Sequence, residues 1–183
     1  MTNREQSLSL LHEWVSSDSL RKHCYAVAAA MEAYAEKYSG DKDAWWTAGL
    51  LHDFDYEKHP TLEQHPVEGV KILREKGYSE EIIQAILGHG NHTGVARESM
   101  MAKTLFAVDE LCGLLVALAK VKPDRFESMT STSVEKALKK KEFARAISRE
   151  DIEQGIKDLG IAREEHFILI ISALRKITKE LGL

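Results

Sequence analysis

Histidine and aspartate side chains gather in the middle of the sequence, and these residue types can hold metal ions. The chain has eight histidines, and most of them lie in one central stretch: His52, His59, His65, His89 and His92. Histidine is the commonest metal ligand in proteins. Imidazole and carboxylate ligands together suit Fe, Mn, Co, Ni or Zn, and sometimes Mg. A bound ion acidifies its water, so metal-bound water can attack a phosphate ester near neutral pH without a Ser or Cys nucleophile.

The candidate ligands follow one another in an order that favours metal binding over packing. His23 lies within one expected helix, His52 and Asp53 end another, and Asp109 lies within a long one. A lone histidine on an apolar stripe is usually a core residue, and an adjacent His-Asp pair is common by chance. Asp109 is harder to explain as packing, because an unpaired carboxylate near an apolar helix face is costly. Side chains on facing helices are how helical bundles build metal sites.

The elements that must position these residues are helices, because helical periodicity covers most of the chain and strand-like alternation is nearly absent. We expect Ser79 and Ser148 to cap two of the helices. Glycine and proline predict loops over residues 54–64 and 88–95. The expected helices span residues 3–15, 18–38, 41–53, 65–77, 80–88, 99–120, 134–146, 149–159 and 164–181.

This pattern predicts an all-α fold made of two parts. Residues 1–125 would form a metal-binding helical domain, and residues 126–183 a C-terminal helical extension packed on it. The alternative is that the last third is a separate small domain, but no linker supports that interpretation. His12 and His166 fit surface or packing roles, and His59 beside Pro60 is expected to be exposed.

Composition narrows the classes of partner. The 183 residues are 44% hydrophobic and 30% charged, with a net charge of −4, so we expect no general affinity for nucleic acid. No apolar run is long enough to span a bilayer, and the N-terminus lacks the pattern of a signal peptide. We therefore expect a cytoplasmic protein with no membrane partner. Cys24 and Cys112 lie in apolar helical patterns and are expected to be buried thiols.

The sequence resembles the HD superfamily of metal-dependent phosphohydrolases, and within it the HDIG-type branch. The resemblance is carried by His23 in RKHCYAVAAAM, by His52 and Asp53 in AGLLHDFDYE, and by Asp109 in FAVDELCG, and it covers about residues 20 to 120. It implies an all-α HD-domain helical bundle with a divalent metal at those four residues.

The same resemblance implies a second metal ion. Members with extra histidines between the HD pair and the last Asp hold two ions, and His65 and His89 match those positions. Asp53 would then bridge both ions. The chain departs from other branches at Asp55 and Tyr56, which replace a Gly-Lys pair and argue against a cyclic-dinucleotide esterase of the HD-GYP type. His89 is also followed by Gly90 rather than by a second histidine.

Several residues near the expected metal centre are candidates for chemistry or substrate binding. We expect catalysis at Asp53 and Asp55, where Asp55, or the nearby Glu57, would orient water or donate a proton. His92 follows a ligand in the same loop, and guanidinium groups bind phosphate through two donors. The expected substrate-binding residues are His92, Arg97, Lys141 and Arg145, although a Lys-rich helix face is more often simply solvated.

Three functions remain open from the sequence. The first is hydrolysis of a phosphoester or phosphoanhydride bond in a small nucleotide or related phosphate compound by metal-bound water. The second is an oxygenase, because some HD proteins with two irons are oxygenases. The third is a non-catalytic sensor or interaction module, which loss of ligands usually marks, whereas all ligands are present here. The sequence does not choose the substrate or the oligomeric state.

Overall fold

A computed structural model describes residues 3–183 of the chain, and no strand forms within that range. The prediction of an all-α fold is therefore confirmed. The helices are α1 (Asn3–Trp14), α2 (Asp18–Tyr38), α3 (Lys42–Leu51), α4 (Val67–Glu75), α5 (Glu80–Gly88), a short 3-10 turn η1 (Asn91–Thr93), α6 (Met100–Val121), α7 (Ser131–Lys139), α8 (Arg149–Leu159) and α9 (Arg163–Lys176).

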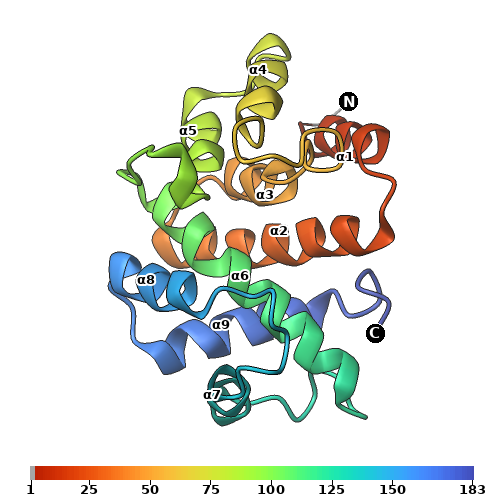
Figure 1. Ribbon diagram of the computed structural model, residues 1–183, viewed down its shortest axis with the longest axis vertical. Coiled ribbons are helices and arrows are strands. Elements are labelled where there is room, and N and C mark those ends of the chain that lie inside the picture. The colour runs from red at the N-terminus through yellow and green to blue at the C-terminus, as the bar shows by residue number, and fades with distance from the viewer. Residues whose placement is uncertain (1–2) are drawn as a thin grey trace.

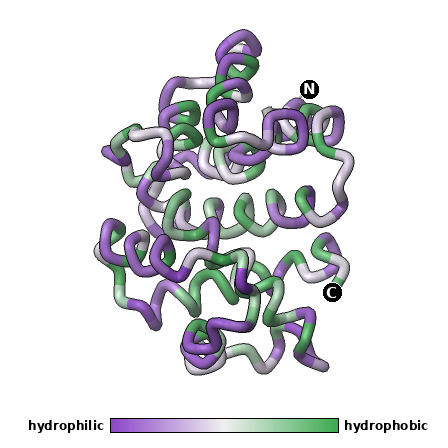
Figure 2. The backbone as a smooth tube through the Cα atoms, in the orientation of Figure 1, coloured by the Kyte–Doolittle hydropathy of each residue, from purple (hydrophilic) through white to green (hydrophobic). Residues whose placement is uncertain are grey.

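Two long helices, α2 and α6, cross at the centre of the molecule (Figure 1). Helices α1, α3, α4 and α5 lie on one side of this pair, and α7, α8 and α9 lie on the other. Hydrophobic residues follow the two central helices, while the outer helices carry long hydrophilic stretches (Figure 2). The core includes Tyr34, Leu50, Leu115 and Phe167, all fully buried.

Helix α8 approaches α6 very closely, and a glycine makes that approach possible. A Cβ atom added to Gly155 would lie 2.6 Å from Cα of Ala107 on α6. Such a distance is far below ordinary van der Waals contact. The absence of a side chain therefore lets the middle of α8 pack directly on the backbone of α6 at Ala107.

One predicted helix, over residues 134–146, is wrong in its second half. Helix α7 ends at Lys139, and residues 141–147 form turns. The cause is Arg149, whose guanidinium donates to the carbonyls of Lys140, Phe143, Ala144 and Ile147. Ala144 adopts a left-handed φ of 47°. An arginine that satisfies these carbonyls replaces the bonds that a helix would make.

Buried polar contacts also tie the two sides together. The hydroxyl of Tyr34 on α2 donates to Nδ1 of His166 on α9 at 2.5 Å, and Nε2–H of His166 donates to the carbonyl of Ala107 on α6 at 3.1 Å. Burial lowers the pKa of His166 to about 4. Cys24 and Cys112 are buried and free, as predicted.

Among residues 3–183, no helix has both the length and the apolar character needed to cross a membrane.

Candidate metal centre

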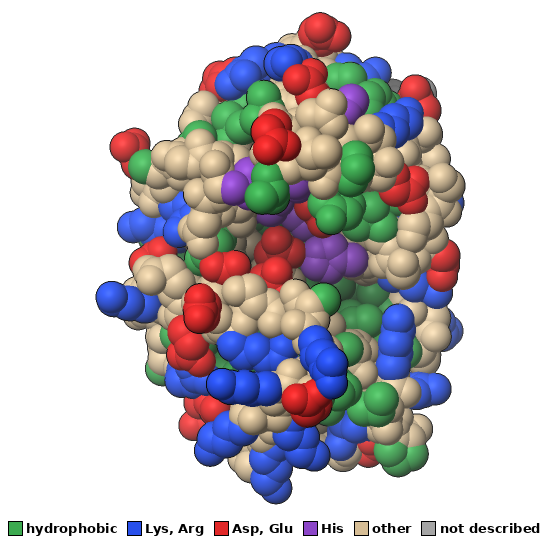
Figure 3. Space-filling model, in the orientation of Figure 1, with side chains coloured by type: hydrophobic (Ala, Val, Ile, Leu, Met, Phe, Trp, Pro, Cys, Tyr) green, Lys and Arg blue, Asp and Glu red, His purple; other side chains and the backbone are tan. Residues whose placement is uncertain are grey.

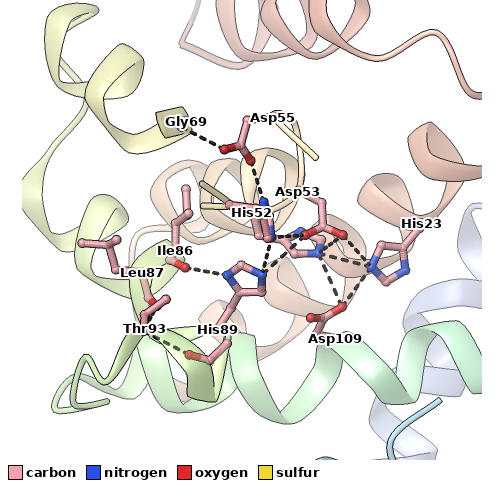
Figure 4. A network of polar contacts seen from close by, with 12 residues as sticks. His23, His52, Asp53, Asp55, Gly69, Ile86, Leu87, His89, Thr93 and Asp109 are labelled. Carbon is pink, nitrogen blue, oxygen red and sulfur yellow. Dashed lines mark hydrogen bonds and ion pairs between the residues drawn. The ribbon is translucent and has the colours of Figure 1, made fainter. Parts of the chain in front are cut away.

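Six side chains from five helical elements converge where α2 and α6 cross α3 and α5 (Figure 4). His23 comes from α2 and Asp109 from α6. The others sit at helix ends, where the chain can turn a side chain inward. His52 and Asp53 follow α3, His65 precedes α4, and His89 follows α5. These are the six residues that the sequence analysis named as metal ligands.

The six residues form two groups that meet at Asp53. One group is His23, His52 and Asp109, and the other is Asp53, His65 and His89, with the ligand atoms of each group within 4.8 Å of one another. In the first group, Oδ1 of Asp109 lies 2.9 Å from Nε2 of His23 and 3.4 Å from Nε2 of His52. In the second, Nε2 of His65 lies 3.2 Å from Nε2 of His89.

Asp53 faces both groups with different oxygen atoms. Its Oδ1 lies 3.2 Å from Nε2 of His65 and 3.4 Å from Nε2 of His89. Its Oδ2 lies 3.4 Å from Nε2 of His52 and 3.8 Å from Nε2 of His23. A carboxylate placed in this way can bind one cation through each oxygen.

Three of the histidines are held so that Nε2 points into the centre. Nδ1 of His52 lies 2.8 Å from the carbonyl of Gly49, and Nδ1 of His89 lies 2.5 Å from the carbonyl of Ile86. A carbonyl can only accept, so these Nδ1 atoms carry the proton and leave the Nε2 lone pair free for a metal. Nδ1 of His65 donates in the same way to Oδ1 of Asp55 at 2.8 Å. Such outer partners are typical of metal-binding histidines.

The charges of the site fit bound cations. Burial alone would lower the pKa of His52, but Asp53 and Asp109 outweigh it and raise that pKa well above its usual value. Against the same effect of burial, hydrogen bonds to Asp53 and Asp55 raise the pKa of His65 to about 9. Although burial would raise the pKa of Asp53, the surrounding histidines hold it well below its usual range. The carboxylates thus gather positive charge, which metal ions could supply instead of protons.

The comparison with family models decides the family. The HD domain model matches residues 20–151 of the chain. The chain belongs to the HD domain family. HD domains are typically metal-dependent hydrolases that bind divalent metals, and the two groups of this structure offer the mixed imidazole and carboxylate donors that such ions need. Neither the search of curated proteins nor the search of solved structures gave a match.

The span matched to the HD domain passes the boundary that the sequence suggested at residue 125. It ends at Asp151, in the first turn of α8. The start of α8 is also where the later part of the chain reaches the site. Ala146, Ile147 and Asp151 line the same pocket as the candidate ligands.

That pocket has a volume of about 450 Å³, within the usual range for small-molecule sites. Figure 3 shows histidine and acidic side chains in the hollow at the middle of this face, with Lys and Arg side chains gathered below it. Besides the candidate ligands other than His52, which is fully buried, the lining includes Tyr56, Asn91, His92, Phe106, Glu110, Gly113 and the residues named above from 146 to 151.

Glu110 is a pocket residue that the sequence analysis missed. Burial, and then the charge of Asp109, raise its pKa to about 7, and it accepts a hydrogen bond from the backbone N–H of Ser148 at 3.0 Å. Helical spacing along the sequence could have identified Glu110 as a residue of the site. Phe106, Glu110 and Gly113 lie three or four residues apart around Asp109, so they share its face of α6. Asp151 and Ile147 carried no comparable signal, because only the tertiary packing of α8 brings them there.

Asp55 requires a correction, because it does not line the pocket and has no exposed surface. Its Oδ1 accepts from His65, and its Oδ2 accepts from the backbone N–H of Gly69 at 2.8 Å. A Cβ atom at Gly69 would lie 2.6 Å from Cγ of Asp55, so the glycine is needed for this approach. Asp55 is therefore a positioning residue for His65 and not a residue that handles water or substrate.

Glu57 is likewise placed away from the pocket. Its carboxylate accepts from the backbone N–H groups of Ser16 and Ser17 at 2.7 and 2.6 Å, just before α2. This holds the loop that follows α3 against the start of α2.

Three of the four expected substrate-binding residues lie outside the pocket lining. The guanidinium of Arg97 stacks on the ring of Phe106 at 3.7 Å and donates to Oδ1 of Asn91 at 3.1 Å. Lys141 and Arg145 are exposed and line a neighbouring surface cavity that shares Ile147 with this pocket. The three therefore lie outside the lining of this pocket, and their part in substrate binding stays a prediction.

His92 is the expected substrate-binding residue that does line the pocket. Its Nε2–H donates to the carbonyl of His65 at 2.8 Å. This bond holds the ring of His92 beside a candidate metal ligand, so its role in substrate binding stays a prediction.

Proposed function

We propose that this HD domain protein is a two-metal phosphohydrolase of the HDIG type. It would cleave a phosphoester or phosphoanhydride bond of a small nucleotide or related phosphate compound. Two divalent ions, when bound, would supply a nucleophilic water and would neutralise charge on the reacting phosphate. In that reaction a bond forms between water oxygen and phosphorus, the bond to the leaving oxygen breaks, and the leaving oxygen takes up a proton.

The observation that carries this proposal is the position of Asp53. One of its oxygens faces His65 and His89, and the other faces His23 and His52. A single-metal site would need only one of these groups. Asp55, which lies outside the second group, accepts a hydrogen bond from His65 and so fixes the orientation of that ring.

The chain's own groups would orient the substrate and control its surroundings. The candidate ligands would hold the cations, and Tyr56, which is 45% exposed, also lines the pocket. Tyr56 packs edge-on against the ring of His65, at 5.2 Å between centroids. A planar group of a substrate can stack on such a ring.

Metal analysis of wild type beside His65→Ala tests the two-metal part of the proposal. We expect about two transition-metal ions per chain in wild type and about one in the variant. His59→Ala is the matched control, because His59 lies in the same loop but outside both groups, and it should keep two ions. One ion in all three proteins would overturn the two-metal proposal.

Phosphate release from p-nitrophenyl phosphate by the manganese-loaded protein tests the chemistry. Asp53→Ala should abolish it while the fold, followed by circular dichroism, is retained. Oxygen consumption by an iron-loaded protein that releases no phosphate would instead indicate an oxygenase. Metal binding with neither activity would indicate a binding module.

A further inference from the structure

The outer wall of the pocket is acidic, and no Lys or Arg is among the described residues that line it. Two acidic residues in that lining, Glu110 and Asp151, belong to neither of the two ligand groups. Sites that bind phosphate chains usually surround them with Lys and Arg. The part of a substrate that lies beyond the metal ions is therefore expected to be something other than a chain of phosphates.

The two acidic side chains are held in place by bonds from several directions. Glu110 on α6 accepts from the backbone N–H of Ser148, the residue that caps α8. Asp151, in the first turn of α8, accepts at Oδ1 from the side-chain amide of Asn91 at 2.8 Å. Asn91 is itself oriented, because its Oδ1 accepts from Arg97. Hydrogen bonds therefore fix the positions of both acidic side chains. Arg97 lies behind Asn91 and does not line the pocket.

The balance of charge indicates which substrates a pocket with this acidic wall can bind. Two divalent ions would be half neutralised by the ligand carboxylates Asp53 and Asp109. A phosphate monoester dianion would neutralise the rest. A further phosphate or carboxylate on the substrate would then lie beside Asp151 and the ionised form of Glu110, with no Lys or Arg in the described lining to offset its charge. Like charges repel more strongly where solvent is limited.

We infer that the pocket selects a phosphate monoester whose organic part carries an ammonium or similar cationic group, which Glu110 and Asp151 bind. This inference rests on the proposed function and deepens it, since it separates monoesters from nucleoside polyphosphates and dinucleoside polyphosphates. Lys141 and Arg145, which could have held additional phosphates, do not line this pocket; they line a neighbouring cavity that shares Ile147 with it.

The test compares three two-carbon phosphate esters whose organic parts are cationic, neutral and anionic: 2-aminoethyl phosphate, ethyl phosphate and carboxymethyl phosphate. Their dissociation constants are measured by titration calorimetry with manganese-loaded protein. We expect the cationic ester to bind tightest and the anionic ester weakest, with at least about a tenfold difference between these two, as expected for a charge-assisted hydrogen bond.

The variants Glu110→Gln and Asp151→Asn, made together, remove the charge but keep an oxygen acceptor for Ser148 and Asn91. They should bring the dissociation constants of the cationic and anionic esters to within about threefold of each other. Glu150→Gln is the matched control. It removes one charge from the same first turn of α8, but Glu150 is exposed and does not line this pocket, so it should keep the full difference.

The outcomes separate this inference from the proposed function. Hydrolysis of p-nitrophenyl phosphate without the expected order of affinities would overturn the inference and leave the hydrolase proposal standing. The expected order without any hydrolysis would support the inference about binding and overturn the hydrolase proposal. An order that the double variant does not change, or no binding of any ester, would overturn the inference.

Discussion

At the scale of single residues, the centre depends on what lies behind each imidazole. His52 and His89 donate to backbone carbonyls one turn back in their own helices, so their orientation follows from the helix itself. His65 has no helix behind it and depends instead on Asp55. The second ligand group should therefore be the more sensitive of the two to substitutions outside it.

We predict that Asp55→Asn lowers the affinity for the second ion by about 10- to 100-fold, as is typical when the partner of a metal-binding histidine is changed. The amide keeps the volume of the carboxylate but has only one acceptor oxygen, so it cannot accept from both His65 and the backbone N–H of Gly69. Titration of the metal against a coloured chelator should show one tight and one weakened ion. Glu57→Gln, in the same loop but bonded to Ser16 and Ser17, should leave both ions tight. Equal weakening by the two variants would contradict the positioning role.

We also predict that metal binding releases protons and strengthens as the pH rises from 6.5 to 9. His65 has a pKa of about 9 in the metal-free protein, so below that pH an ion must displace its proton. The raised pKa also means that charged His65 stabilises the metal-free fold below pH 6.5, and that this contribution is lost as the pH passes 9. Calorimetry in two buffers of different ionisation enthalpy counts the released protons. A metal affinity that does not change over this range would contradict the prediction.

At the scale of elements, one side chain donates several hydrogen bonds to the segment between α7 and α8, which also has backbone turns of its own. The guanidinium of Arg149 contacts four backbone carbonyls between residues 140 and 147, and its Nε is buried without a partner. Ala146 and Ile147, from the same segment, line the pocket. The segment thus lines the site and depends on Arg149 for several of its hydrogen bonds.

We predict that Arg149→Met releases this segment without unfolding the protein. Methionine keeps much of the apolar stem but supplies no donors, so all four carbonyls lose the bond from Arg149, and only those of Lys140 and Ala144 keep a backbone donor. Trypsin should then cut after Lys140, Lys141 or Arg145 at least about tenfold faster than in wild type, because a local opening free energy falls by more than about 1.4 kcal/mol. Lys157→Met, an exposed change on α8, is the control and should not alter these cuts. Unchanged cutting in both variants would show that Arg149 does not hold the segment.

Sequence patterns predicted most helices because their caps and apolar stripes are local. Ser79 and Ser148 cap α5 and α8 as expected. The pattern failed over residues 140–146, where the composition favours a helix but Arg149, from outside the pattern, binds the carbonyls. It also failed for Asp55, because only the distant glycine at 69 shows that this carboxylate turns away from the pocket.

At the scale of the whole molecule, three helices meet at one buried imidazole. His166 on α9 accepts from Tyr34 on α2 and donates to the carbonyl of Ala107 on α6. This arrangement requires a neutral ring, because a protonated Nδ1 could not accept the tyrosine's hydrogen bond. The later helices are thereby tied to the part of the chain that holds the candidate ligands.

We predict that this contact makes the fold sensitive to mild acid. The pKa of His166 is about 4 in the folded protein, below its usual value of 6.5, so the unfolded chain binds a proton more readily as the pH falls. The contribution of neutral His166 to the free energy of unfolding is fully present above pH 6.5. It is lost as the pH falls from 6.5 to 4, by at most about 3 kcal/mol. Urea unfolding at pH 7 and pH 5 measures the loss. His166→Gln should lose less between the two pH values than wild type, and an equal loss would contradict the prediction.

The close approach of Gly69 to Asp55 provides a criterion that can be applied to related sequences. A carboxylate two residues after the His-Asp pair can turn back to a ligand histidine only where the glycine four residues beyond that histidine leaves room. Together these two positions form a marker that needs no structure to apply. In a related sequence that has the aspartate but a larger residue at the glycine position, we expect the carboxylate to point elsewhere and the second ion to be held loosely or not at all.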